Sequence, residues 1–160
     1  MKQYIGTKLI EAEPAYRVRR DNGNFAITDD PAKLFPSYPS VEEGYRVRYP
    51  DGYESWSPKE VFERAYLPME TNKELRTDKP SISQEMVDNF IVETWTQTAG
   101  DKTTIVRALL RNGFELVEAS SCVSQENYDE KMGRDICMRK IRDRVWYLLG
   151  FLLQTAVHGV

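Results

Sequence analysis

Two β-prone runs of mostly apolar and β-branched residues flank the dipeptide Asn112-Gly113. Residues 103–110 read T-T-I-V-R-A-L-L, and residues 114–119 read F-E-L-V-E-A. Asn-Gly between two β-prone runs is a strong hairpin signal, because a type I′ turn requires positive φ at both central residues. The pattern therefore predicts an antiparallel hairpin with a type I′ turn at Asn112-Gly113.

A helical pattern follows the hairpin and predicts one long helix over residues 124–153. Ser124 is the predicted N-cap, because its hydroxyl can accept from a backbone N–H of the first turn. Gly133 lies inside this helix, where glycine costs about 1 kcal/mol relative to alanine, so we expect the hairpin to pack closely on it. The predicted buried face consists of Tyr128, Met132, Ile136, Met138, Ile141, Val145, Leu148, Leu149 and Leu152.

The first 69 residues carry shorter runs and predict a β-rich module. Residues 8–13 and 16–20, on either side of Pro14, are predicted strands, and residues 25–28 are a returning strand. Residues 29–40 contain three prolines and predict a long surface loop. Residues 45–49 and 53–56 are predicted strands that flank a tight turn at 50–52.

One short helix is predicted after these strands. Ser57-Pro58 with Glu60 forms a capping-box pattern with proline at the first helical position. The predicted buried face of this helix consists of Val61, Phe62, Ala65 and Tyr66.

The fold class expected from these patterns is α+β. Residues 1–69 form the β-rich module with its short helix, and the polar residues 70–81 form a linker. Residues 82–160 form a helix, the hairpin and the long C-terminal helix. The first of these helices starts at Ser83, and its apolar positions continue at helical spacing through Trp95.

Composition narrows the classes of function. The chain has 160 residues and a formal net charge of −3, so it lacks the positive charge that a general nucleic-acid binder uses to neutralise phosphates. Cys122, Cys137 and His158 are the only cysteines and histidine, one ligand short of a structural zinc site. We expect no metal, no cofactor, no membrane partner and a cytoplasmic protein with reduced thiols.

The segment from Asn112 to Gly133-Arg134, N-G-F-E-L-V-E-A-S-S-C-V-S-Q-E-N-Y-D-E-K-M-G-R, resembles a phage and prophage family first named from coliphages N-four and Sf-six. The resemblance covers roughly residues 82–153. Met132 stands where the family usually has isoleucine. Residues 44–66, with Tyr4-Ile5-Gly6-Thr7-Lys8 before them, also resemble an N-terminal module of phage accessory proteins. The resemblance implies a phage or prophage origin, and the family brings no settled catalytic activity.

Two groups of residues are candidates for binding an anionic ligand. Ser121, Ser124 and Asn127 surround the expected helix start, with Lys131 and Arg134 just beyond it, and Arg107 and Arg111 approaching from the hairpin. The second group pairs guanidinium groups with aromatic rings that can stack on nucleobases, and consists of Arg46, Arg48, Tyr53 and Trp56. In the alternative interpretation Ser124 only caps its helix and the arginines are solvated.

Catalysis is the weaker hypothesis. Cys122 would need a base, and the chain has only His158. The acidic residues Glu126, Asp129 and Glu130 are also expected in a first helical turn from the macrodipole alone.

We therefore expect a non-enzymatic phage accessory protein. Its most specific form is an oligomeric sponge that sequesters a nucleotide-derived host immune signal, such as a cyclic oligonucleotide or an ADP-ribose derivative. Oligomerisation is expected because residues 146–153, W-Y-L-L-G-F-L-L, are apolar nearly all round. A protein–protein inhibitor or adaptor of a host enzyme and a nucleotide hydrolase remain the alternatives.

Overall fold

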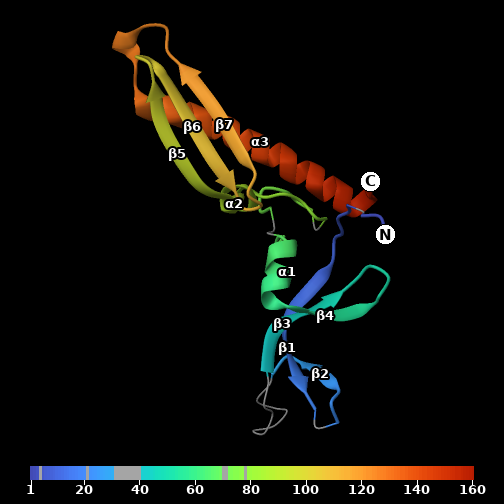
Figure 1. The fold of residues 1–160 in the computed structure, drawn as a ribbon. Coiled ribbons are helices and arrows are strands. Elements are labelled where there is room, and N and C mark those ends of the chain that lie inside the picture. The colour runs from blue at the N-terminus through green and yellow to red at the C-terminus, as the bar shows by residue number, and fades with distance from the viewer. Residues whose placement is uncertain (4, 21, 31–40, 70–71, 78) are drawn as a thin grey trace. The chain divides into compact units, whose positions relative to one another are not determined.

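The computed structural model describes residues 1–3, 5–20, 22–30, 41–69, 72–77 and 79–160. These residues form helices and two antiparallel sheets, so the predicted α+β class is confirmed (Figure 1). The chain divides into two compact units, one built on Met1–Pro68 and one on Met69–His158. The linker at 70–81 stays a prediction, and most of the predicted loop at 29–40 lies outside the described residues.

The first unit contains a four-stranded sheet in the order β2-β1-β3-β4. The strands are β1 (Glu11–Arg19), β2 (Phe25–Thr28), β3 (Val41–Arg48) and β4 (Glu54–Pro58). The predicted break at Pro14 is wrong, because β1 runs through it with Pro14 opposite Tyr45. Strand β2 pairs only with residues 16–19 of β1. Among the described residues no strand pairs with β1 on that side at Pro14, and a residue without an N–H is tolerated there.

The core of the first unit is small. Ala15, Val18 and Val47 are at most 2% exposed, and the Trp56 ring lies over Gly44, where a Cβ would clash with it. Such a small core leaves most of the sheet surface exposed to solvent.

Helix α1 (Lys59–Ala65) differs from its prediction at its start and on its buried face. Ser57 and Pro58 belong to β4, and no side chain caps the helix, so the predicted capping box is wrong. Phe62 stacks on Tyr45 and Tyr66, with ring centroids 4.1 and 4.9 Å apart. No residue of α1 is buried, and Val61 is 49% exposed. The helix therefore packs through an aromatic stack rather than through an aliphatic face.

The second unit begins with α2 (Gln84–Phe90), capped as predicted by Ser83, whose hydroxyl accepts from the Met86 N–H at 3.2 Å. The predicted continuation of this helix to Trp95 is wrong, because β5 (Ile91–Ala99) starts directly after Phe90. The sequence I-V-E-T-W-T-Q-T is rich in β-branched and aromatic residues, which pack well on a pleated sheet. This preference for a strand outweighs the helical spacing of the preceding apolar residues, from which the sequence predicts a longer helix.

Strands β6 (Thr103–Leu110) and β7 (Glu115–Ser121) confirm the predicted hairpin. Its turn is not type I′. The Leu110 N–H donates to the Phe114 carbonyl and the Gly113 N–H to the Leu110 carbonyl, which leaves a three-residue loop. Only Gly113 in it has positive φ, at 83°. A three-residue loop with glycine in the left-handed region is the common alternative to the two-residue turn.

The start of the long helix also differs from its prediction. Ser124 precedes a short 3-10 helix, η2 (Gln125–Asn127), and its side chain caps nothing. The helix proper is α3 (Glu130–His158). The carboxylate of Asp129 accepts from the Met132 N–H at 2.9 Å, so Asp129 is the N-cap. The aspartate adds a negative charge at the positive end of the helix dipole.

Helix α3 lies along one face of the β5-β6-β7 sheet and packs on β6 and β7 (Figure 1). The predicted close approach at Gly133 is confirmed, because a Cβ there would lie 2.7 Å from Thr104 Cβ. The predicted face is wrong in part, because Met132, Leu148 and Leu152 are 62%, 36% and 40% exposed. The buried residues, mostly four positions apart, are Gly133, Cys137, Met138, Ile141, Val145 and Leu149.

Candidate functional site

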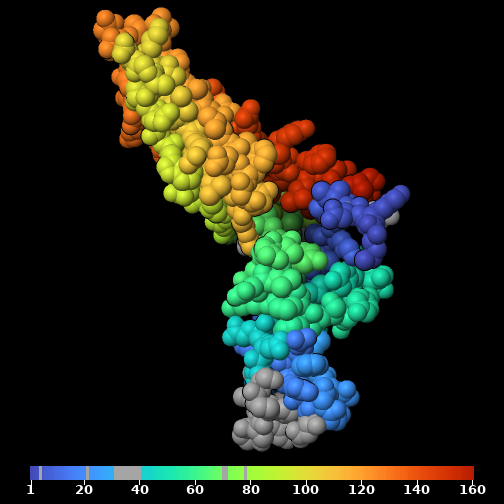
Figure 2. Space-filling model, viewed as in Figure 1, coloured from blue at the N-terminus to red at the C-terminus, as the bar shows by residue number. Residues whose placement is uncertain are grey.

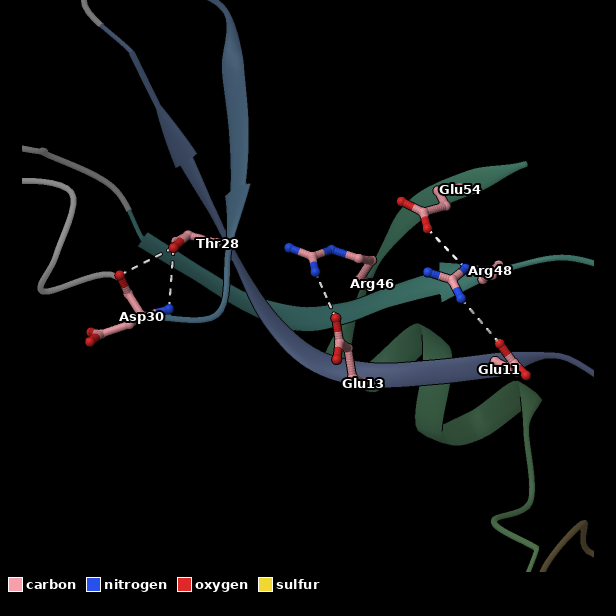
Figure 3. Close-up of polar contacts among 7 residues, drawn as sticks. All are labelled: Glu11, Glu13, Thr28, Asp30, Arg46, Arg48 and Glu54. Carbon is pink, nitrogen blue, oxygen red and sulfur yellow. Dashed lines mark hydrogen bonds and ion pairs between the residues drawn. The ribbon is translucent and has the colours of Figure 1, made fainter. Parts of the chain in front are cut away.

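Arg46 and Arg48, the arginines of the second candidate group, are already paired with carboxylates. Arg46 contacts Glu13 at 2.6 Å, and Arg48 contacts Glu54 at 3.0 Å and Glu11 at 3.6 Å (Figure 3). These side chains line an open pocket of about 150 Å³ together with Ala12. Three glutamates surround two arginines there, so an incoming phosphate would have to displace carboxylates already bound to the guanidinium groups.

The aromatic members of this group lie apart from that pocket. Trp56 packs beside Arg17, whose guanidinium carbon is 4.2 Å from the ring centroid, and its indole N–H donates to the Ala15 carbonyl at 3.4 Å. Tyr53 is 64% exposed and stacks on Tyr49. Neither Tyr53 nor Trp56 lines the pocket of Arg46 and Arg48. The four predicted residues share one sheet but do not form one site.

The hydroxyl and amide residues of the other group hold the loop that follows β7. The Ser121 hydroxyl lies 2.9 Å from the Thr103 hydroxyl. The Ser124 carbonyl accepts from the Asn127 N–H at 3.2 Å and from the Cys122 thiol at 3.0 Å. These contacts set the path of the chain between β7 and α3.

Lys131 and Arg134 belong to the same group, and they differ from Arg46 and Arg48 in their ion pairing. Lys131 and Arg134 are exposed on the first turns of α3, and neither makes an ion pair with any described residue. Two of the nearby acids are engaged, since Asp129 caps the helix and Glu130 accepts from the Thr98 hydroxyl at 2.8 Å. Two cations are thus available to an anion at the start of α3.

The β5 side of α3 is where Arg134 lies. Glu130 reaches Thr98 of β5, and residues four apart in a helix share a face, so Arg134 follows Glu130 along the same side. The Tyr128 hydroxyl is 2.7 Å from the Thr98 hydroxyl and 3.1 Å from that of Thr104. Hydroxyl groups and a guanidinium therefore occupy one region.

One pair of residues was missed from the sequence. The guanidinium carbon of Arg107 lies 4.0 Å from the centroid of the Trp95 ring, and the two residues are cross-strand partners. They occupy the sheet face opposite α3, because their neighbours Val106 and Ala108 are fully buried. The expected approach of Arg107 to the helix start is wrong. Alternation along residues 91–99 is the signal that would have located the pair.

Few of the groups considered for catalysis lie together among the described residues. Burial raises the pKa of the Cys137 thiol, which is fully enclosed. No group of three or more potential metal ligands occurs among the described side chains. Likewise, no helix in the described part of the chain is long and apolar enough to cross a membrane.

Comparison with known proteins gives one relationship. No curated protein and no solved structure matches the chain. Residues 82–157, which comprise α2, the β5-β6-β7 sheet and nearly all of α3, match a family of phage proteins. This span agrees with the resemblance seen around the Asn112-Gly113 turn. The description of the family whose model matches residues 82–157 is Phage protein (N4 Gp49/phage Sf6 gene 66) family.

Proposed function

We propose that this phage protein is a non-enzymatic, oligomeric binding protein that sequesters a small nucleotide-derived signal of the host's immune response. The ligand site lies at the start of α3, beside β5. The observation that carries the proposal is the pair of exposed cations, Lys131 and Arg134, that no described carboxylate neutralises.

Phosphate recognition explains why unpaired cations matter. A guanidinium donates two parallel N–H bonds to phosphate oxygens, and an ammonium adds a point charge. Arg46 and Arg48 would first have to give up Glu13 and Glu54. Arg134 and Lys131 have no such competitor among the described residues, so we assign the phosphate contacts to them.

The polar groups around Arg134 suit the rest of a nucleotide. Thr98 and Tyr128 present hydroxyls that can donate to or accept from ribose and phosphate oxygens. Two carboxylates there are held in structural contacts, Asp129 by a backbone N–H and Glu130 by Thr98. Such engaged acids support retention of a ligand over its hydrolysis.

Calorimetric titration tests this assignment. The wild-type protein is titrated with cyclic di- and trinucleotides and with cyclic ADP-ribose isomers. We expect micromolar or tighter binding of at least one, and about a tenfold or larger loss in Arg134→Ala, the cost of a charge-assisted hydrogen-bonded contact. Arg46→Ala is the matched control, because it removes an arginine that is ion-paired, and it should bind as the wild type does.

Two results would contradict the proposal. One is the absence of binding to every compound in the panel at micromolar concentration. The other is a larger loss in Arg46→Ala than in Arg134→Ala, which would move the site to the first unit. Release of a cleaved product during the titration would favour the nucleotide hydrolase instead.

A host-protein inhibitor or adaptor is the second candidate, and a specific surface favours it. Tyr147 and Phe151 are 75% and 67% exposed, one turn apart on α3. Exposed aromatic side chains of this kind are enriched at protein interfaces. Capture of one host protein by the wild type, lost in Phe151→Lys and kept in Arg134→Ala, would support this function.

A further inference from the structure

The two edges of the β5-β6-β7 sheet are not equivalent. At the β7 edge, Lys140 of α3 donates to the Ala119 carbonyl at 3.0 Å, and Arg144 pairs with Glu118 at 3.1 Å. Strand β5 forms the other edge, and α3 packs mainly on β6 and β7. In Figure 2 the β5 side chains, coloured yellow-green, lie open along the margin of the second unit.

Two backbone hydrogen bonds determine which backbone groups of β5 face outward. The Leu110 N–H bonds Phe114 across the hairpin, and the Arg111 N–H bonds Phe90 on the β5 side. Because successive residues of a strand point their N–H and C=O to opposite sides, the odd residues of β6 face β5. Their partners are Glu93, Trp95, Gln97 and Ala99. The N–H and C=O groups of Thr94, Thr96 and Thr98 therefore point away from the sheet.

The same reasoning accounts for the β7 edge. The even residues of β6 face β7, so Ala119 points its carbonyl outward, where Lys140 meets it. A lysine from the packed helix thus satisfies a group of the β7 edge, as natural proteins often do to block unwanted pairing. No comparable contact with the outward groups of β5 is formed by the described residues.

The sequence of β5 lacks the features that discourage pairing. It is nine residues long and contains no proline, lysine or arginine, and after an irregularity between Ile91 and Glu93 its register is regular through Ala99. Its central segment, Thr94-Trp95-Thr96-Gln97-Thr98, has threonine at every outward position, symmetrically about Thr96. Such an edge can pair with an identical strand that lies antiparallel to it.

We infer that β5 pairs with β5 of a second copy of this chain, antiparallel, about a two-fold axis at Thr96. Thr96 lies opposite Thr96 of the other copy, and each Thr94 lies opposite a Thr98. All three are hydrogen-bonded pairs, each exchanging two N–H···O bonds, and cross-strand threonine pairs are favourable. The result is one continuous sheet with both α3 helices on the same face.

This pairing gives a specific form to the oligomer expected for the proposed function. Only the role of the oligomer in holding a ligand rests on that function. The threonine side chains of both β5 strands would form a row between the two helices, with an Arg134 on each side. The interface itself requires no ligand, so the mass of the ligand-free protein tests it independently of any titration.

Light scattering after size exclusion, at micromolar concentration, is the first experiment. We expect the wild type to have an even multiple of the mass of one chain, and Thr96→Pro and Thr96→Lys to halve it. Proline at an outward edge position disturbs only the pairing between copies, and lysine places two like charges at the axis. Mixing Thr96→Lys with Thr96→Glu should restore the wild-type mass.

Val117→Pro is the matched control, because Val117 is an outward position of the β7 edge, and it should keep the wild-type mass. Hydrogen exchange on the wild type needs no variant. The amides of Thr94, Thr96 and Thr98 should exchange slowly when concentrated and rapidly when diluted. A monomeric wild type, an unchanged mass in both Thr96 variants, a halved mass in Val117→Pro, or fast exchange of these amides in the oligomer would each overturn the inference.

Discussion

Gly133 of α3 lies directly against Thr104 of β6, with no space for a side chain between them. A Cβ at Gly133 would fall 2.7 Å from Thr104 Cβ, and Thr104 is itself fully buried. The absent side chain lets helix and sheet approach each other at this point. The contact sets the distance between α3 and the hairpin in the part of the chain that matches the phage protein family.

Replacing this glycine should destabilise the protein although alanine is the better helix former. Overpacking costs about 1–3 kcal/mol, whereas the gain in helix propensity is at most about 1 kcal/mol. Chemical denaturation of Gly133→Ala should therefore give a lower free energy of unfolding than the wild type.

Gly150→Ala is the control for this comparison, because Gly150 also lies inside α3 and an added Cβ there meets nothing within 4 Å. That variant should be as stable as the wild type or more stable by up to about 1 kcal/mol. A Gly133→Ala protein as stable as Gly150→Ala would show that the sheet can move away from the helix at little cost.

Local patterns predicted the elements that carry their own signals. The hairpin follows from Asn112-Gly113 between two β-prone runs, and the close packing at Gly133 follows from a glycine inside an apolar-striped helix. The boundary between α2 and β5 could not be predicted from local patterns, because Met86, Val87 and Phe90 have helical spacing and no helix-breaking residue separates them from Ile91. The choice of Ser124 over Asp129 as N-cap failed because both residue types are strong caps.

The candidate site depended on contacts that local patterns do not contain. Arg46 is neutralised by Glu13, a residue 33 positions away, and that meeting is decided by the register of β3 on β1. Arg134 lacks a partner for a similar reason, since Glu130 is engaged by Thr98 across the fold. Charge counts along the chain gave these arginines the same weight, and only the strand register separates them.

Tyr128 joins the start of α3 to the sheet, and removing its hydroxyl should be costly. The hydroxyl is 3.1 Å from that of Thr104, which is buried and has no other described side-chain partner. Tyr128→Phe leaves the Thr104 hydroxyl unsatisfied, which should lower the free energy of unfolding by about 1–2 kcal/mol.

Tyr147→Phe removes the same group from a tyrosine that is 75% exposed, and should change stability by less than about 0.5 kcal/mol. Equal denaturation curves for the two variants would mean that Thr104 finds another acceptor or donor when Tyr128 loses its hydroxyl.

The ion pair between Asp88 of α2 and Arg142 of α3 should make stability depend on pH at the acid end. The Arg142 guanidinium, 2.8 Å away, holds the pKa of the Asp88 carboxyl below its ordinary value, and a hydrogen bond from Gln84 acts in the same direction. A carboxyl whose pKa is lowered by folding contributes stability above its unfolded pKa, about 3.9. That contribution is lost as the pH falls through the lowered, folded-state pKa.

Both side chains are nearly half exposed, at 47% and 44%, so solvent screening limits the pair to less than about 1 kcal/mol. Urea denaturation of the wild type and Asp88→Asn should differ by this amount at pH 7 and converge near pH 2. Asp143→Asn, at an exposed position of α3 without a described ion pair, should follow the wild-type curve throughout. A gap between Asp88→Asn and the wild type that is as wide at pH 2 as at pH 7 would mean that the aspartate stabilises α2 through its shape or its hydrogen bonds and not through its charge.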